Sequence, residues 1–100
     1  MKNVLNVGQC LPDHSAIRHY LTANFDVSVD QAALPDDTLA ALRRKRYDLV
    51  LINRKLDEDY SDGIEILHAI KQDAELRAIP VMLVTNYPEH QAASVAAGGV

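Results

Sequence analysis

The chain has few of the residues that mark a secreted, membrane-spanning or disordered protein. A single cysteine, Cys10, excludes an internal disulfide, which is typical of a reducing compartment. No apolar run approaches the roughly 20 residues that a membrane span needs. The opening segment MKNVLNV has one lysine and too short an apolar stretch for a signal peptide. These absences favour a protein of the cytoplasm that does not enter a membrane.

Basic residues are also scarce. The chain has 10 lysines and arginines against 14 acidic residues, and its net charge is −4. Nucleic-acid affinity comes mainly from basic surface, so we expect no direct nucleic-acid binding. The one basic cluster, residues 43–46, lies at the end of a predicted helix, where cations interact favourably with the helix dipole. It is therefore interpreted as a solvated helix end.

What the chain does contain is a regular alternation of apolar runs and helix-start residues. Strands are predicted at residues 4–7, 25–29, 48–53 and 81–84, and helices from residues 12, 35, 64 and 88. The continuous runs LVLI and VMLV are typical of central strands that are covered on both faces. The alternating pattern from Phe25 to Val29 predicts an exposed edge strand.

Strands that alternate with helices predict an α/β fold, a doubly wound parallel sheet with helices on both faces. One hundred residues suffice for a single domain, residues 1–100. A sheet of this type normally continues after a fourth helix, so we expect the domain to be cut short at its C-terminal end.

Ligands of such sheets bind beyond the carboxyl ends of the strands. Those ends carry Gly8 and Gln9, Asn53 with its loop, and Thr85, and they are expected to converge. The four histidines are scattered, with no pair at a spacing of three or four residues, so no metal site is expected from them.

The order and spacing of these pieces resemble the receiver domain of two-component response regulators. The matching segments are VLNVGQC, YDLVLIN, DGIEIL, IPVMLVTN and AAGG, and together they cover essentially the whole chain. The resemblance implies a flavodoxin-like sheet of order 2-1-3-4, with a fifth strand and helix after Val100. It also implies phosphotransfer from a histidine kinase to an aspartate, assisted by an acidic pair with Mg²⁺, a Ser or Thr, and a Lys.

The residues at the matching positions depart from that pattern. Asn53 stands at the phosphoacceptor position, and Gly8 and Gln9 stand at the acidic pair, so three expected carboxylates are absent together. Thr85 keeps the hydroxyl, whereas Asn86 replaces a small residue and would crowd a phosphoryl group. An amide is a poor nucleophile, and Mg²⁺ is usually held by one or two carboxylates. We therefore expect no catalysis, no cofactor, and weak or absent Mg²⁺ binding.

Two functional hypotheses remain open. In the first, the domain is a pseudo-receiver that acts in signal transduction through contacts with a protein partner: a histidine kinase, another receiver or an attached output domain. Exposed helix surfaces near His14, Arg18 and residues 89–91 are candidate contacts. In the second, it is an active receiver that uses a carboxylate of the acidic loop, for which the candidates are Asp57, Glu58, Asp59 and Asp62.

A third possibility is a small anion held between Gln9, Asn53 and Thr85, because the usual negative charge is gone. Asn53 also has a purely structural interpretation, as a polar group at a strand end that bonds backbone amides of the following loop. On that interpretation Asn53→Asp would be tolerated for folding and would not by itself restore phosphorylation.

Overall fold

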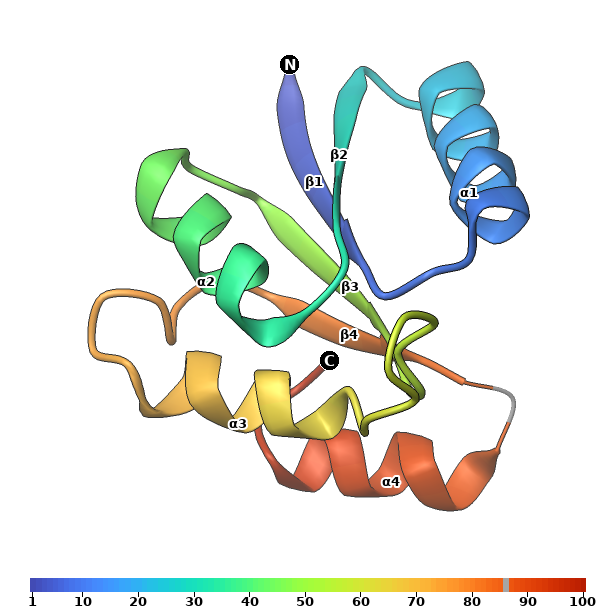
Figure 1. Cartoon of the computed structure of the whole chain (residues 1–100). Coiled ribbons are helices and arrows are strands. Elements are labelled where there is room, and N and C mark those ends of the chain that lie inside the picture. Colours follow the sequence, from blue (N-terminus) through green and yellow to red (C-terminus); the bar gives the residue numbers. More distant parts are fainter. Residues whose placement is uncertain (86) are drawn as a thin grey trace.

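The structure is a computed structural model, which describes residues 1–85 and 87–100. Strands and helices alternate along the chain, as the sequence predicts (Figure 1). In order they are β1 (Lys2–Val7), α1 (Leu11–Asn24), β2 (Val27–Ala32), α2 (Pro35–Arg44), β3 (Leu49–Asn53), α3 (Ile64–Gln72), β4 (Val81–Val84) and α4 (Pro88–Ala96).

The strands form one parallel sheet in the order β2-β1-β3-β4, which confirms the predicted fold class and strand order. In the register of the sheet Val7 lies opposite Ala32 and Ile52, and Asn53 lies opposite Val84. Because all strands run in the same direction, their carboxyl ends meet at one edge. That edge is where the predicted site residues follow the strands.

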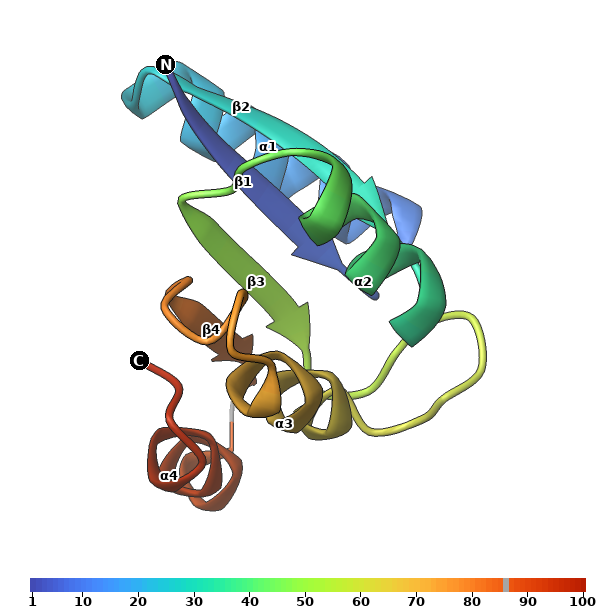
Figure 2. The same ribbon diagram turned by 90° about the vertical axis from the view of Figure 1, so that its left-hand side faces the viewer.

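The helices lie on both faces of the sheet. Figure 2 shows α1 behind β1 and β2, with α2 and α3 in front, and α4 beside α3 at the β4 end of the sheet. A proline occupies the first turn of α1, α2 and α4, where its missing N–H would have no helical partner. At the start of α2 the Asp37 carboxylate accepts hydrogen bonds from the N–H groups of Ala33 and Leu34, at 2.9 and 2.7 Å.

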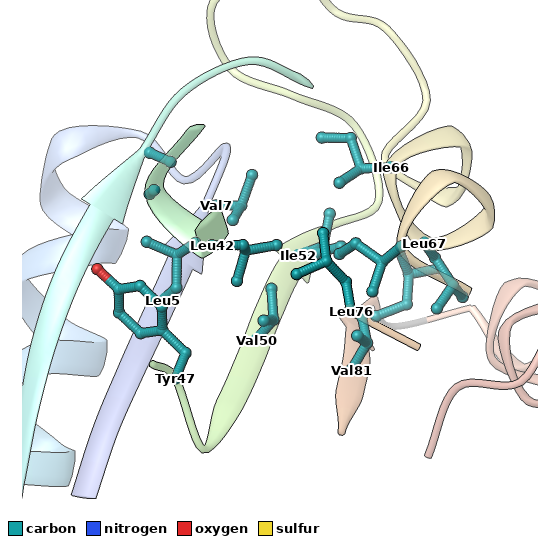
Figure 3. Close-up of a cluster of buried hydrophobic side chains, with 14 of the residues drawn as sticks. Leu5, Val7, Leu42, Tyr47, Val50, Ile52, Ile66, Leu67, Leu76 and Val81 are labelled. Carbon is teal, nitrogen blue, oxygen red and sulfur yellow. The ribbon is translucent and has the colours of Figure 1, made fainter. Parts of the chain in front are cut away.

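The main core lies between the sheet and the α2–α3 layer. Figure 3 shows Val50 and Ile52 of β3 between Leu42 of α2 and Leu67 of α3. The side chains of the apolar run in β3 lie alternately on this face and on the opposite face of the sheet, since successive side chains of a strand point to opposite sides. Leu56, from the loop after β3, is fully buried in the same core, so this loop is anchored by its own side chain.

The α1 face is packed less completely. His14 is the one buried residue of α1. Tyr20 is 53% exposed, and Ile17 and Leu21 are half-buried. A shallow apolar groove of about 510 Å³ runs between α1 and the sheet; it is lined by Ala16, Ile17, Tyr20, Leu21, Leu49, Leu51, Met82 and Val84.

Two expectations about strands need correction. β2 begins at Val27 and not at Phe25, because the N–H of Phe25 donates to the carbonyl of Leu21 and closes α1. β4 was expected to be central, but in the sheet formed by the described residues it is an edge strand. Its outer edge receives one hydrogen bond, from the N–H of Val100 to the carbonyl of Val81 at 2.9 Å. A fifth strand after Val100 stays a prediction.

Candidate functional site

A crevice of about 420 Å³ opens at the carboxyl ends of β1, β3 and β4, beside the first turns of α1. Among the predicted site residues, the structure brings Gln9, Asn53 and Thr85 together here. Asn86, expected to crowd the site, lies outside the described residues. The described residues that line the crevice are Gln9, Asp13, Ala16, Ile17, Asn53, Arg54, Lys55, Val84, Thr85 and Tyr87.

Gly8 does not line the crevice but is bonded through its carbonyl to Asn53, which does, and it has a conformation that excludes most side chains. Its φ is +75°, and a Cβ built there would lie 2.4 Å from Cδ2 of Leu56. The left-handed region is costly for residues with a Cβ, and a side chain would also displace the buried leucine. The carbonyl of Gly8 accepts a hydrogen bond from the N–H of Asp57 at 2.9 Å. The backbone of the loop thus lies directly over the position where the family carries an acid.

Asn53 is fixed by its amide nitrogen. Nδ2 donates to the carbonyl oxygen of Lys55 at 2.7 Å and to that of Gly8 at 3.3 Å. An amide NH₂ has two donors, so both are used. Asn53 therefore has the structural role that was predicted, but its partners are backbone carbonyls and not the backbone amides that the sequence led us to expect. We use the word floor for Asn53, which lines the crevice, together with Gly8 and Leu56, which are not among its described lining residues but pack next to Asn53.

This contact changes one expectation from the sequence. A carboxylate has no donor, so Asp at position 53 in the same rotamer would place an oxygen against two carbonyl oxygens. Repulsion of this kind costs free energy of folding. We therefore now expect Asn53→Asp to destabilise the domain.

The wall of the crevice, formed by Gln9, Arg54, Lys55 and Thr85, is polar and incompletely hydrogen-bonded. Gln9 is 7% exposed, and its Nε2 is buried without a partner within residues 1–85 and 87–100. Nε of Arg54 is also buried and unpartnered in the same part of the chain. The hydroxyl oxygen of Thr85 accepts a hydrogen bond from the N–H of Tyr87 at 3.2 Å.

Arg54 and Lys55 were not identified from the sequence as site residues. The signal was present: two cations follow Asn53 directly, at the end of a central strand. Nζ of Lys55 lies 5.6 Å from the centre of the exposed Tyr60 ring, a cation–π geometry. The two cations face one carboxylate among the described lining residues, Asp13, so the charge of the crevice is net positive.

The residues present do not fit the Mg²⁺ ion that the receiver fold implies. Gly8 and Gln9 supply no carboxylate, and Asn53 directs its nitrogen at the carbonyls of Gly8 and Lys55. Mg²⁺ requires oxygen ligands, usually with one or two carboxylates, whereas this crevice presents Arg54 and Lys55. Within the described chain no group of three His, Cys, Asp or Glu side chains is placed to hold a metal.

The acidic loop lies next to the crevice but its carboxylates do not line it. Asp57, Asp59 and Asp62 are absent from the described lining residues. Asp59 accepts hydrogen bonds from the hydroxyl and the N–H of Ser61, at 2.6 and 2.9 Å, and these bonds lower the pKa of its carboxyl group. Asp62 accepts a hydrogen bond from the N–H of Ile64 at 3.1 Å, at the start of α3.

The proposed contact surface on α1 needs a correction at His14. This side chain is 8% exposed, and its Nδ1 lies 3.1 Å from Nδ2 of buried Asn6. His14 is therefore part of the packing between α1 and β1. Arg18 is exposed, as expected.

Comparison with known proteins shows the family. The family model described as Response regulator receiver domain matches residues 12–99, so the chain belongs to the receiver domains of two-component signalling. No curated protein matches the chain. No helix in residues 1–85 or 87–100 has the length and apolarity to span a membrane.

Solved structures show the same fold. The N-terminal domain of a response regulator receiver protein from Methanoculleus marisnigri is 24% identical, with a TM-score of 0.84; the match covers 100% of this chain and 80% of that one. The Mn²⁺-bound form of response regulator Rcp1 is 23% identical, with a TM-score of 0.82 and coverages of 99% and 77%. NtrX from Brucella abortus is 20% identical, with a TM-score of 0.83; the match covers 98% of this chain and 22% of NtrX.

Proposed function

We propose that this receiver domain is a pseudo-receiver, which transmits signals through protein contacts and does not accept a phosphoryl group at the family's usual position. The observation that carries the proposal is the hydrogen bonding of Asn53. Its Nδ2 donates to the carbonyls of Lys55 and Gly8 and so serves the folding of the loop. An aspartate nucleophile could not make these two bonds.

The neighbouring positions support the same interpretation. Gly8, at one acidic-pair position, adopts φ +75° under Leu56, and its carbonyl binds both Asn53 and the N–H of Asp57. Gln9, at the other position, is a neutral amide. The substitutions at positions 8 and 53 are thus linked through shared contacts, which favours one co-adapted structural unit over independent losses.

For the partner, only its class is proposed. As a member of a signalling family, the domain would act with a histidine kinase, another receiver or an attached output domain, in the cytoplasm. Because the chain spans 22% of NtrX, the activity of any longer protein is also a proposal.

The alternative is an active receiver that uses Asp57, Asp59 or Asp62. It is weakened by the engagement of Asp59 with Ser61 and of Asp62 with the N–H of Ile64. Phosphoryl transfer depends on positioning and on neutralisation of charge, and we see no carboxylate of this loop in the described lining of the crevice.

Intact-mass spectrometry after incubation with a small phosphoryl donor and Mg²⁺ tests the proposal. A receiver with its aspartate and acidic pair intact is the positive control. We expect no phosphoryl adduct on the wild-type domain and none on Asn53→Asp. An adduct on the wild-type domain that disappears in an Asp57→Asn, Asp59→Asn, Asp62→Asn triple variant would establish the alternative and refute the pseudo-receiver.

A further inference from the structure

We propose that the crevice binds a tetrahedral oxyanion of the phosphate class, non-covalently and without a metal ion. The receiver family binds a phosphoryl group there as an aspartyl phosphate beside Mg²⁺. This chain has lost the carboxylates that hold the metal and has placed cations and unpartnered donors in the same space. The inference rests on the proposed function in one respect: both require that the crevice has no acceptor carboxylate at position 53.

The first support is charge. Arg54 and Lys55 line the crevice, and Asp13 is the one acidic residue among its described lining residues. Neither cation forms an ion pair within residues 1–85 and 87–100. Arg43 pairs with Asp73 and Lys45 with Asp30, so these two cations, unlike Arg54 and Lys55, already have an acidic partner. The crevice is thus a place where positive charge remains available to a ligand.

The second support is the state of the buried donors. Nε2 of Gln9 and Nε of Arg54 are both buried without a hydrogen-bond partner in the described chain. A buried polar group that lacks a partner costs free energy, so such groups are rare in folded proteins. Both belong to residues that line one crevice. An anion with several acceptor oxygens would satisfy both at once.

Small adjustments would suffice for this contact. The terminal amide torsion of Gln has a broad energy minimum, so Nε2 of Gln9 can turn toward the crevice at little cost. Arg presents a planar fork of donors that suits phosphate oxygens. Lys55 adds a flexible charge, since its present contact is only with the face of Tyr60.

The arrangement of donors favours a tetrahedral anion. Gln9 follows β1, Arg54 and Lys55 follow β3, and Thr85 follows β4, so the donors come from three strand ends. Asn53 is not part of this set, because both of its amide hydrogens are used by Lys55 and Gly8. The anion site is therefore displaced from the one expected between Gln9, Asn53 and Thr85, toward the two cations.

The test is an NMR titration of the ¹⁵N-labelled domain with inorganic phosphate, at constant ionic strength and with EDTA present. We expect saturable shifts of the Gln9 side-chain amide and of the backbone amides of Lys55 and Thr85. Arg54→Gln should weaken binding by about ten-fold or more, since one charge-assisted hydrogen bond has about this effect. Gln9→Met should weaken binding several-fold.

Arg77→Gln is the matched control, because Arg77 is exposed and lies outside the crevice. It should leave the affinity unchanged within about two-fold, as expected for a screened surface charge. Acetate should bind more weakly than phosphate.

Three results would overturn the proposal: shifts that do not saturate, equal loss of affinity in Arg54→Gln and Arg77→Gln, or acetate binding as tight as that of phosphate. The outcome is separable from that of the proposed function, because a covalent phosphoryl group changes the mass of the protein and bound phosphate does not.

Discussion

Two polar regions on this sheet use similar residues in opposite ways. In the Asp30 cluster, formed by Asp30, Lys45 and Tyr47, the carboxylate accepts hydrogen bonds from the Tyr47 hydroxyl at 2.6 Å and from Lys45 Nζ at 2.9 Å. Lys45 also lies 5.6 Å from the centre of the Tyr47 ring. The three groups satisfy one another, so the cluster has no need of a ligand.

The wall of the crevice presents the contrast. Gln9 and Arg54 each keep a buried donor without a partner in the described chain, and Arg54 and Lys55 lack an acidic partner there. The comparison teaches that polar residues in the Asp30 cluster stabilise the fold, whereas those in the wall cost stability and are available for binding. The sign of a mutation's effect on stability should therefore differ between the two regions.

The largest effect on the free energy of unfolding is expected at the floor. If substitutions there were tolerated, the comparison between the two regions would fail. Gly8→Asp should lower the free energy of unfolding by about 2–4 kcal/mol, from left-handed strain and from the clash with Leu56. Urea unfolding followed by circular dichroism measures it. Gly8→Ala should cost nearly as much, because the Cβ itself meets Leu56. A Gly8→Ala variant as stable as the wild type would show that the floor is not rigid.

A somewhat smaller loss is expected for Asn53→Asp. The new carboxylate would face the carbonyls of Lys55 and Gly8 in place of two hydrogen bonds, which should cost about 1–3 kcal/mol. The same urea experiment measures it, and Asn53→Ala separates the loss of the bonds from the added repulsion. Asn53→Asp as stable as the wild type would mean that the side chain turns away from the floor.

In the Asp30 cluster, Tyr47→Phe should lower the free energy of unfolding by about 1–2 kcal/mol. The ring still fills its buried position, but Asp30 loses its shortest hydrogen bond. Tyr20→Phe is the matched control and should be neutral, since Tyr20 is 53% exposed. If Tyr47→Phe were as stable as the wild type, the hydrogen bond from Tyr47 to Asp30 would not stabilise the fold, and the contrast with the wall would be lost.

The same cluster should give a dependence of stability on pH. Hydrogen bonds from Tyr47 and Lys45 lower the pKa of Asp30 below 3.8, so its contribution is present above that pH and is lost as the pH falls further. Burial and the bond to Asp30 raise the pKa of Tyr47 from 10.0 to about 12. Its contribution is therefore present below pH 10 and is lost between pH 10 and about 12.

Urea unfolding of the wild type and of Asp30→Asn, below pH 3.8 and between pH 10 and about 12, checks the acidic and the alkaline loss of stability. The variant should lose less stability than the wild type between pH 10 and 12, because the raised pKa of Tyr47 depends in part on Asp30. Parallel curves for the two proteins would contradict the coupling.

The smallest effect, and the one of opposite sign, is expected in the wall. Gln9→Met removes an unpartnered buried donor while keeping the shape of the side chain, so stability should be unchanged or rise by up to about 1 kcal/mol. Thermal unfolding measures it, and Gln72→Met, at the exposed end of α3, serves as the control. A clear loss of stability would mean that Gln9 is structural and would erase the contrast with the Asp30 cluster.

Much of the fold was predictable because its signals are local. The run LVLI, the prolines at helix starts and the spacing of Ile66, Leu67 and Ile70 each specify an element from neighbouring residues. The start of β2 was misplaced because Phe25 closes α1 through a hydrogen bond to Leu21, which apolar alternation does not indicate. His14 was expected at the surface, and its burial depends on contact with Asn6 of β1.

The candidate site could be predicted only in part. The convergence of Gln9, Asn53 and Thr85 followed from the parallel sheet and was confirmed. The contribution of Arg54 and Lys55 was missed, because which residues after a strand end turn into a crevice depends on the path of the loop. That path is set by Leu56, which is buried in the main core and holds the loop against Gly8.

The sequence by itself determined the alternation of strands and helices, the parallel sheet, and the chemical types at the site: an amide where the family has a nucleophile, and neutral residues where it has acids. These follow from residue identity and spacing, which require no knowledge of distant contacts. Only the tertiary structure decided that Asn53 donates to two carbonyls, that Gly8 is closed over by Leu56, and that the donors of Gln9 and Arg54 are left without partners. Hydrogen bonding and burial depend on groups far apart in the chain, and these are brought together only when it folds.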